Sequence, residues 1–482
     1  MNIAIIGGGL TGLTAAYELL KHGHQVTVFE SEKTLGGLAG SLKMPHWNWS
    51  LEYFYHHFFT NDKALISLAN ELGLEKDMLV LRPVTATLIR NKSEIQRLRD
   101  SETQKIPILR KSDSLSVPSA IFQLDSPLNL LTFPLLSPID KIRTAALLGF
   151  CKINPFWKPL ETITAEQLFK TIGGKHAWEL LWEPLMAGKF GTYAKDVPAS
   201  WLWARFYKRT MQLEYFQGGF QTFIDRLAEA IIQHGGKIVT NSDVASINHD
   251  IRNKKYEVRI MQKNHSYIVN HKSYFDKILI TTPSSTAVKL LSSLHHSYIR
   301  NDLLFVDEEE QLATYTQRLL SIPHLWAQTL ILETNKPILD KTYWLNVTDR
   351  SFPFIAVVAH TNMIDKKYYG GNHITYIGNY LPDHHPFLTM TKQQLLKKFL
   401  PYLKKINPSF IYKPRTMNYE LFTLPSAQPV HTLNYSQKAP AIKTPIDGIY
   451  LANLDSIYPW DRGTNYAVEL GQKAAIMMEG EI

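Results

Sequence analysis

The chain of 482 residues is short of cysteine and of long apolar runs, and each shortage excludes a class of protein. A single cysteine, Cys151, excludes a disulfide framework and a cysteine-rich metal site. No stretch reaches about 18 uninterrupted apolar residues, so no membrane span is expected. Met1 leads directly into an apolar run without a basic leader, so no signal peptide is expected. These features predict a cytoplasmic protein without a metal site.

Charge of one sign is in mild excess but is not concentrated. There are 52 Lys and Arg against 43 Asp and Glu, a net charge of +9. Such an excess can favour nucleic acid or an anionic membrane, but the basic residues form no long run, so no nucleic-acid-binding arm is expected. Hydrophobic content of 45% and charged content of 20% are ordinary for a folded protein. The length predicts two intertwined domains.

The first thirty residues contain a glycine motif between a predicted strand and a predicted helix. Residues 2–6 are a continuous apolar run, typical of a strand buried on both faces. Gly7-Gly8-Gly9-Leu10-Thr11-Gly12 follows, then a predicted helix over 13–22 and a strand over 25–29 that ends at Glu30. This order of strand, G-x-G-x-x-G, helix, strand and acid indicates a dinucleotide-binding Rossmann fold.

Each part of this motif has a physical task toward a dinucleotide. Gly7 permits a tight turn, Gly9 lets the backbone approach a pyrophosphate, and Gly12 lets helix and strand pack closely. The free N–H groups at the helix N-terminus bind the pyrophosphate. Glu30 accepts from the ribose hydroxyls. The cofactor contacts predicted beside these are Leu10, Thr11 and Ser31.

A glycine doublet, Gly36-Gly37, follows soon after the ribose-binding acid. With this doublet the sequence resembles the amine oxidase, protoporphyrinogen oxidase and phytoene desaturase superfamily of FAD enzymes. The resemblance implies FAD, with the doublet close to its phosphates. Leu38 replaces the usual arginine after the doublet and removes one phosphate contact. Some relatives tether the flavin through a cysteine near the last helix, but Cys151 is far from it, so the FAD is expected to be non-covalent.

The resemblance covers the whole chain and implies an α/β fold. It predicts a discontinuous Rossmann-like FAD-binding domain of residues 1–85, 215–290 and 426–482. Residues 86–214 and 291–425 should form an interleaved α+β substrate-binding domain. The apolar strands and amphipathic helices that return near residues 215–290 and 445–475 support this division.

Further FAD contacts are implied where the chain returns to the flavin domain. The Val244 backbone should meet the adenine, and Thr282 should end a strand beside the cofactor. Relatives have a Gly-Asp pair where this chain has Asn453 and Leu454, so Asp455 and Asp461 are the alternative carboxylates for that contact. The N-terminus of the last helix should face the flavin, at Gly463, Thr464 and Asn465.

Two adjacent histidines, His56 and His57, lie among aromatic residues after the glycine doublet. In relatives this segment runs past the flavin ring. Imidazoles there could hydrogen-bond the flavin or move a proton near neutral pH. The alternative, that both are structural histidines, remains open at this point.

The predicted substrate domain is rich in aromatic residues, which predicts an apolar or aromatic pocket, although such residues also build cores. Trp344, His360 and Asn362 are candidate pocket residues at a strand and at the end of another. Arg205 could pair with a substrate carboxylate or phosphate, or form a structural ion pair.

The polar-poor segment over residues 126–150 has two interpretations. It is either buried core of the substrate domain or a peripheral membrane contact, with Lys141 and Arg143 meeting anionic headgroups. Pro127, Pro134 and Pro138 prevent one long amphipathic helix here.

Together these features predict an FAD-dependent oxidoreductase of the oxidase or desaturase type, acting on an apolar or aromatic small molecule by hydride transfer to flavin. The alternative is an isomerase like the UDP-galactopyranose mutases, in which reduced FAD acts without net redox change. That alternative predicts Arg and Tyr pairs that grip a diphosphate. The fold does not decide between them.

Overall fold

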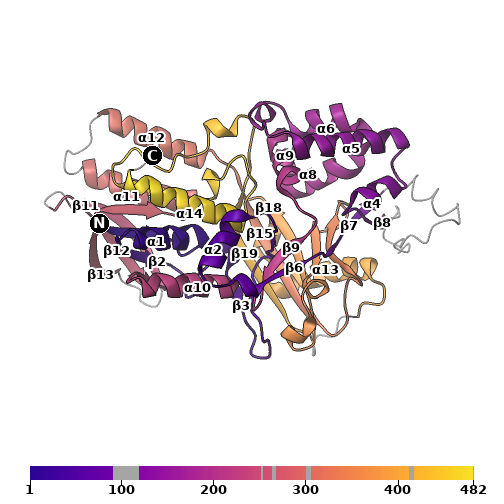
Figure 1. Cartoon of the computed structure of the whole chain (residues 1–482), viewed down its shortest axis with the longest axis horizontal. Coiled ribbons are helices and arrows are strands. Elements are labelled where there is room, and N and C mark those ends of the chain that lie inside the picture. Colours follow the sequence, from indigo (N-terminus) through magenta and orange to yellow (C-terminus); the bar gives the residue numbers. More distant parts are fainter. Residues whose placement is uncertain (91–118, 251–252, 263–267, 300–305, 412–416, 481–482) are drawn as a thin grey trace.

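The computed structural model describes residues 1–90, 119–250, 253–262, 268–299, 306–411 and 417–480. Figure 1 shows two halves side by side, with both chain ends in the same half. Residues 91–118, 300–305 and 412–416, which fall in the predicted substrate domain, lie outside the described residues.

The first half is built on a five-stranded sheet in the order β10-β2-β1-β14-β20. Every neighbouring pair is parallel. Its strands come from three distant parts of the chain, which confirms the predicted α/β fold with a discontinuous Rossmann-like domain. They are β1 (Asn2–Ile6), β2 (Gln25–Phe29), β10 (Lys237–Val239), β14 (Lys277–Ile280) and β20 (Ile449–Leu451).

Both faces of this sheet are buried, as the continuous apolar run in β1 requires. Ile3 and Ile5 pack in the core with α1 (Leu10–Lys21), α10 (Phe220–Gln233) and α14 (Thr464–Glu479). Ala4 and Ile6 point to the opposite face, because side chains alternate along a strand. That face is covered by a three-stranded sheet and two helices, β11 (Ser242–Asp250), β12 (Lys255–Gln262), β13 (Ile268–Phe275), α11 (Ser284–Ile299) and α12 (Val306–Leu320).

One helix beyond residue 290, the predicted end of the second flavin segment, packs against the parallel sheet. Leu312, Tyr315 and Leu319 of α12 share one core with Ile278 and Ile280 of the parallel sheet. The apolar face of α12 therefore belongs to the flavin half, and the substrate half resumes at β15. The sequence did not indicate which half α12 belongs to, because α12 is amphipathic like the helices on either side of it.

The second half combines a seven-stranded sheet, order β19-β15-β18-β17-β16-β7-β8, with a group of helices. The strands are β7 (Val84–Arg90), β8 (Ser119–Gln123), β15 (His324–Thr334), β16 (Thr342–Val347), β17 (Ala356–Ala359), β18 (His373–Leu381) and β19 (Tyr419–Pro429). The helices are α4 (Pro127–Thr132), α5 (Pro138–Ile153), α6 (Ala165–Gly173), α7 (Lys175–Ala177), α8 (Glu183–Phe190), α9 (Ala199–Lys208) and α13 (Lys392–Ile406).

Short elements join the two halves. A small sheet, β5-β9-β6, and a helix connect the early flavin segment to the chain that returns from the substrate half. They are β3 (Ser41–Leu42), β4 (Leu51–Glu52), β5 (Phe58–Phe59), α2 (Lys63–Glu71), β6 (Met78–Leu81) and β9 (Leu213–Phe216). In the part of the chain that the structure describes, no helix is long and apolar enough to cross a membrane.

Candidate functional site

The two glycine motifs lie side by side at the carboxyl end of the parallel sheet. The Gly7 amide donates to the Phe29 carbonyl at 2.8 Å, and the Gly36 amide donates to the Gly8 carbonyl at 2.8 Å. Gly9 and Gly36 form a parallel bridge. β1 lies between β2 and β14, so the chain leaves this point toward both sides of the sheet. Such a switch point is where α/β sheets bind dinucleotides.

Backbone geometry explains why glycine is needed at these positions. A Cβ on Gly12 would lie 2.1 Å from the Gly7 carbonyl oxygen, so only glycine allows α1 to pack this closely on β1. Gly36 and Gly37 have φ of 110° and 56°, in the left-handed region that favours glycine. A Cβ on Gly9 would meet nothing within 4 Å. Gly9 therefore faces open space beside the N-terminus of α1, as a pyrophosphate site requires.

Glu30 is buried at the end of β2, with its carboxylate turned back toward the glycine loop. It accepts from the amides of Gly8 and Glu32 at 2.7 and 2.8 Å and from the Ser31 hydroxyl at 3.2 Å. A carboxylate has about four lone-pair positions, so capacity remains for a ribose hydroxyl. The Ser242 amide donates to the Glu30 carbonyl, which brings β11 and the buried Val244 to the same edge.

Two helices point their N-termini at this edge. A Cβ on Gly471 would lie 2.6 Å from the Thr11 carbonyl oxygen, and His22 contacts Glu479 at 2.6 Å, so α1 and α14 run parallel. Thr464 begins α14 seven residues before Gly471, so α14 extends past this contact by about 10 Å. Its N-cap, Gly463, offers no side-chain cap, which leaves the first N–H groups available.

These features fit an elongated dinucleotide cofactor. A pyrophosphate at the N-terminus of α1 would leave the flavin ring within reach of the N-terminus of α14. The Thr282 hydroxyl, at the end of β14, is buried without a partner among the described residues. The side chain of Asn465 is hydrogen-bonded within the protein. Its Oδ1 accepts from the Leu65 amide at 3.1 Å, and its Nδ2 donates to Glu469.

Asn453 and Asp455 tie the ends of β14 and β20 together. Asn453 Nδ2 donates to the Thr282 carbonyl and to the Ser284 hydroxyl, each at 3.0 Å. Asp455 is bonded by Ser284 and by His324, whose Nε2 lies 2.7 Å from Asp455 Oδ1. Asn453 and Asp455 therefore use their side chains within the protein.

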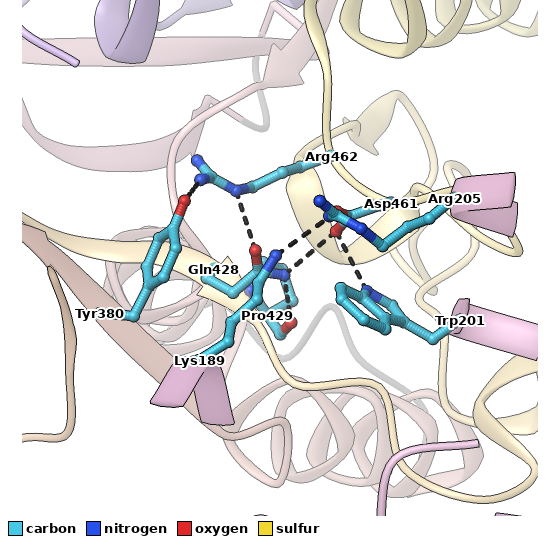
Figure 2. A network of polar contacts seen from close by, with 8 residues as sticks. All are labelled: Lys189, Trp201, Arg205, Tyr380, Gln428, Pro429, Asp461 and Arg462. Carbon is cyan, nitrogen blue, oxygen red and sulfur yellow. Dashed lines mark hydrogen bonds and ion pairs between the residues drawn. The ribbon is translucent and has the colours of Figure 1, made fainter. Parts of the chain in front are cut away.

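Asp461, the other candidate carboxylate, is the centre of a charged network (Figure 2). Its Oδ2 lies 2.5 Å from the Arg205 guanidinium and 3.5 Å from Lys189 Nζ, and its Oδ1 accepts from the Trp201 indole at 3.1 Å. Burial acts to raise the pKa of Asp461, but the neighbouring cations, Lys189 first, hold it below its usual range. Burial lowers the pKa of Lys189 well below its usual range.

Arg462 extends this network toward β18 and β19. Its Nε donates to Gln428 Oε1 at 2.9 Å, and its terminal nitrogen bonds the Tyr380 hydroxyl (Figure 2). Burial, with Arg205 adding to it, lowers the pKa of Arg462 to about 10. Burial and Arg205 likewise lower the pKa of Arg209 to about 10. Sequence reasoning found Arg205 and Asp461 but missed Lys189, Arg209 and Arg462, because no local spacing connects them.

The histidine pair lies close to this network. His56 Nδ1 lies 2.5 Å from the Phe54 carbonyl and therefore carries the proton, which leaves Nε2 as an acceptor. His57 Nδ1 lies 3.2 Å from the Tyr343 hydroxyl. Burial, with nearby arginines, lowers the pKa of His56 to about 4 and of His57 to about 3. Both imidazoles are thus neutral at physiological pH.

The remaining candidate residues divide into two groups. Trp344 packs edge-on against Tyr55, with ring centroids 4.7 Å apart, and lies 6.0 Å from His57. His360 is instead buried in a tyrosine cluster, where its Nε2 contacts the Tyr369 hydroxyl at 2.8 Å. Asn362 donates to the backbone carbonyls of Leu339, before β16, and of Thr342, the first residue of β16. The structure brings Trp344 to the histidine pair, but not His360 or Asn362.

Leu38, in place of the family arginine, packs against an apolar group. It contacts the cluster of Phe54, Ala327 and Ala427, which also includes Tyr53 and Tyr380. Cys151 is buried in the core of the helical part of the substrate half. In the described part of the chain, no group of three or more His, Cys, Asp or Glu is arranged to hold a metal ion.

A parallel sheet with glycine motifs at its switch point and two aligned helix N-termini defines a dinucleotide-binding flavoprotein fold. The chain belongs to the family of flavin containing amine oxidoreductases, whose model matches residues 10–476. Membership of this family agrees with the flavin cofactor that the sequence predicted.

Similar proteins include desaturases, oxidases and a mutase. The chain is 38% identical over 98 residues to a zeta-carotene desaturase of Capsicum annuum, a match that covers 20% of this chain and only 16% of that enzyme. A provisionally assigned protoporphyrinogen oxidase from Exiguobacterium sp. 255-15 has the same fold, with TM-score 0.70, 16% identity and coverage of 100% and 99% of the two chains. Reduced UDP-galactopyranose mutase also has this fold, with TM-score 0.69 and 14% sequence identity. The match covers 100% of this chain and 96% of the mutase chain.

Proposed function

We propose that the protein oxidises an organic small molecule by hydride transfer to FAD, as an oxidase or desaturase. The observation that carries this proposal is the aromatic wall of Tyr55, His57 and Trp344, in which Tyr55 and His57 follow the glycine doublet and Trp344 comes from β16. When bound, FAD supplies the hydride acceptor. The edge-to-face pair of Tyr55 and Trp344 offers flat, apolar surface against which a substrate can be oriented.

The histidines contribute as neutral imidazoles in this proposal. With its Nδ1 proton committed to Phe54, His56 has Nε2 free to accept a proton or a hydrogen bond. His57 contacts the Tyr343 hydroxyl, which orients its ring. Because burial depresses both pKa values, neither ring would act as a charged acid at neutral pH. This narrows their role to proton acceptance or hydrogen bonding.

Anaerobic mixing of the flavin-loaded protein with candidate amines, polyenes and porphyrinogens tests the proposal. A substrate should bleach the flavin absorbance, and an electron acceptor should restore it. His56→Ala and His57→Ala should slow bleaching by about 10²–10⁴-fold if an imidazole takes a proton. His22→Ala, half-exposed and distant in the flavin half, is the control. Unchanged bleaching rates in both variants would remove the histidines from the mechanism.

A second candidate function is an isomerase that works with reduced FAD. The pairing of Arg462 with Tyr380 supports it, because such Arg and Tyr pairs suit a diphosphate. Turnover of a nucleotide sugar only after dithionite reduction, without consumption of reductant, would establish this function over the first.

We also propose that the face of α4 and α5 contacts an anionic lipid bilayer. Large apolar side chains on it are 60–80% exposed, namely Leu128, Leu131, Ile139, Ile142 and Ile153. Lys141, Arg143 and Lys152 lie on the same helix, against a single acid, Asp140. An apolar face flanked by basic residues matches a surface with anionic headgroups. In Figure 1 these helices lie in the half opposite the chain ends.

Part of the segment over residues 126–150 is buried core, since Phe133 and Leu135 are buried. Another part is exposed, as Leu131 is, and could contact a membrane. The sharp test is therefore flotation with vesicles containing phosphatidylserine, comparing wild type with Ile142→Ser and Ile153→Ser. Both variants should float less. An exposed apolar residue elsewhere, Ile232, gives the matched control Ile232→Ser. Failure of the wild type to float would refute membrane contact.

A further inference from the structure

The network around Asp461 contains more positive than negative charge. Arg205 acts electrostatically on both Arg209 and Arg462, and Asp461 is the carboxylate beside Arg205, Arg209 and Lys189. Three guanidiniums against one carboxylate leave about two positive charges, even if Lys189 is neutral. Such an excess inside a protein is costly unless a further anion balances it.

Arg209 is the cation of this network with the most hydrogen-bond donors still available. Among the described residues, no hydrogen bond or ion pair is made by its guanidinium, although its backbone carbonyl accepts from Lys152. Arg209 is an exposed residue with Arg205 and Asp461 as its charged neighbours. Such an exposed group lies where an anion from solvent can reach it. A guanidinium there presents five donors to whatever enters.

The position of the cluster separates it from the pyrophosphate site. Arg462 directly precedes Gly463, the N-cap of α14, which extends about 10 Å beyond its contact with α1. Arg205 and Arg209 both act on the His57 ring, and Arg462 acts on His56. The cations therefore lie near the histidine pair, on the side of the site where α14 begins.

We propose that Arg205, Arg209 and Arg462 bind an oxyanion group of the substrate, a phosphate or a carboxylate, beside the flavin ring. This rests on the proposed function only in assigning the bound molecule as the substrate. Asp461 holds Arg205 in place at 2.5 Å, and Gln428 and Tyr380 hold Arg462, so two guanidiniums are oriented before the anion arrives. Guanidiniums suit this task because their planar forks match the oxygens of both groups.

An anion site changes the class of substrate that we expect. A purely apolar substrate would leave the positive charge unbalanced, whereas a molecule with an apolar part and an anionic end satisfies both the aromatic wall and the cations. The sequence predicted only the apolar part, because the aromatic residues are abundant and the cations are scattered over α8, α9 and the loop before α14.

Titration of the oxidised, flavin-loaded protein with inorganic phosphate and with succinate tests the proposal. Calorimetry and the flavin absorbance spectrum report binding without turnover. At least one anion should bind, more weakly as salt increases. Arg209→Gln should weaken it by about 10- to 100-fold, since a bond to a charged group is lost. Arg209→Lys should recover part of the loss, and Arg226→Gln on the exposed surface of α10 should change nothing.

The relative affinity for the two anions distinguishes a phosphoryl from a carboxylate substrate. Equal affinity of the wild type and Arg209→Gln would overturn the proposal. So would a lowered flavin reduction potential in Arg209→Gln without a change in anion affinity, because the cations would then serve the flavin. Since the flavin stays oxidised, these results do not depend on whether any substrate bleaches it. Failure of the hydride-transfer proposal would therefore be seen separately.

Discussion

The two ends of the proposed active site are suited to anions by different means. At the pyrophosphate end, Gly9 and the N-terminus of α1 present backbone N–H groups and the partial charge of a helix. At the substrate end, full charges are carried by side chains from α8, α9 and the loop before α14. The first arrangement is inseparable from the sheet that forms it. The side chains of the second arrangement can be substituted one at a time. Such substitutions could change the substrate that is bound without loss of flavin binding.

The largest expected effect is at the backbone end. Gly9→Val should abolish FAD binding, because its side chain would enter the open space where a pyrophosphate must lie. The ratio of flavin to protein absorbance after purification measures this. Gly149→Val is the matched control, since a Cβ on Gly149 also meets nothing within 4 Å but lies on α5. A folded Gly9→Val protein with full FAD occupancy would show that the backbone site is wrongly placed.

A smaller effect is expected at the side-chain end. Asp461→Asn should lower the free energy of unfolding by about 3 kcal/mol, the low end for a buried pair, because it leaves partly buried cations without their counter-charge. Urea denaturation of the flavin-loaded protein measures the loss. Glu183→Gln breaks the exposed pair with Arg350, whose side chains are 40% and 59% exposed, and should cost less than about 1 kcal/mol. Equal losses in the two variants would mean that the Asp461 network is not buried as described.

The smallest effect concerns pH. Burial lowers the pKa of His431 to about 4, with Asp461, Asp455 and Lys189 as its charged neighbours. The unfolded chain takes up this proton near pH 6.5 and the folded one does not, so stability should fall as pH falls from about 6.5 to 4. His431→Phe should reduce that slope by about 1.4 kcal/mol per pH unit. An identical slope in wild type and variant, from urea midpoints between pH 7.5 and 5, would contradict this.

The backbone end could be predicted from the sequence, because its requirements are local. Gly7, Gly9 and Gly12 follow an apolar strand directly, and the resemblance located the two later returns to the same sheet. The cation cluster could not be predicted, since Lys189, Arg205 and Arg462 meet only through tertiary packing. One local signal existed: Arg462 stands immediately before the predicted N-terminus of the last helix.

The histidines show a second limit of sequence reasoning. Their position among aromatic residues suggested proton transfer near neutral pH, but the same aromatic residues bury them. Burial then moves the pKa of His56 and His57 to about 4 and 3. The sequence around a titratable residue indicates which side chains surround it. The shift of its pKa depends on how completely those side chains exclude water.

The strand order also determines when the protein can acquire its flavin during synthesis. β1 and β2 emerge first from the ribosome, but β14 and β20, which continue the same sheet, follow much later. At about 5–20 residues per second, β20 appears tens of seconds after β1. Until then the edge of β14 that pairs with β20 stays open. The nascent chain is therefore expected to depend on chaperones, and flavin capture should be one of the last events of its synthesis.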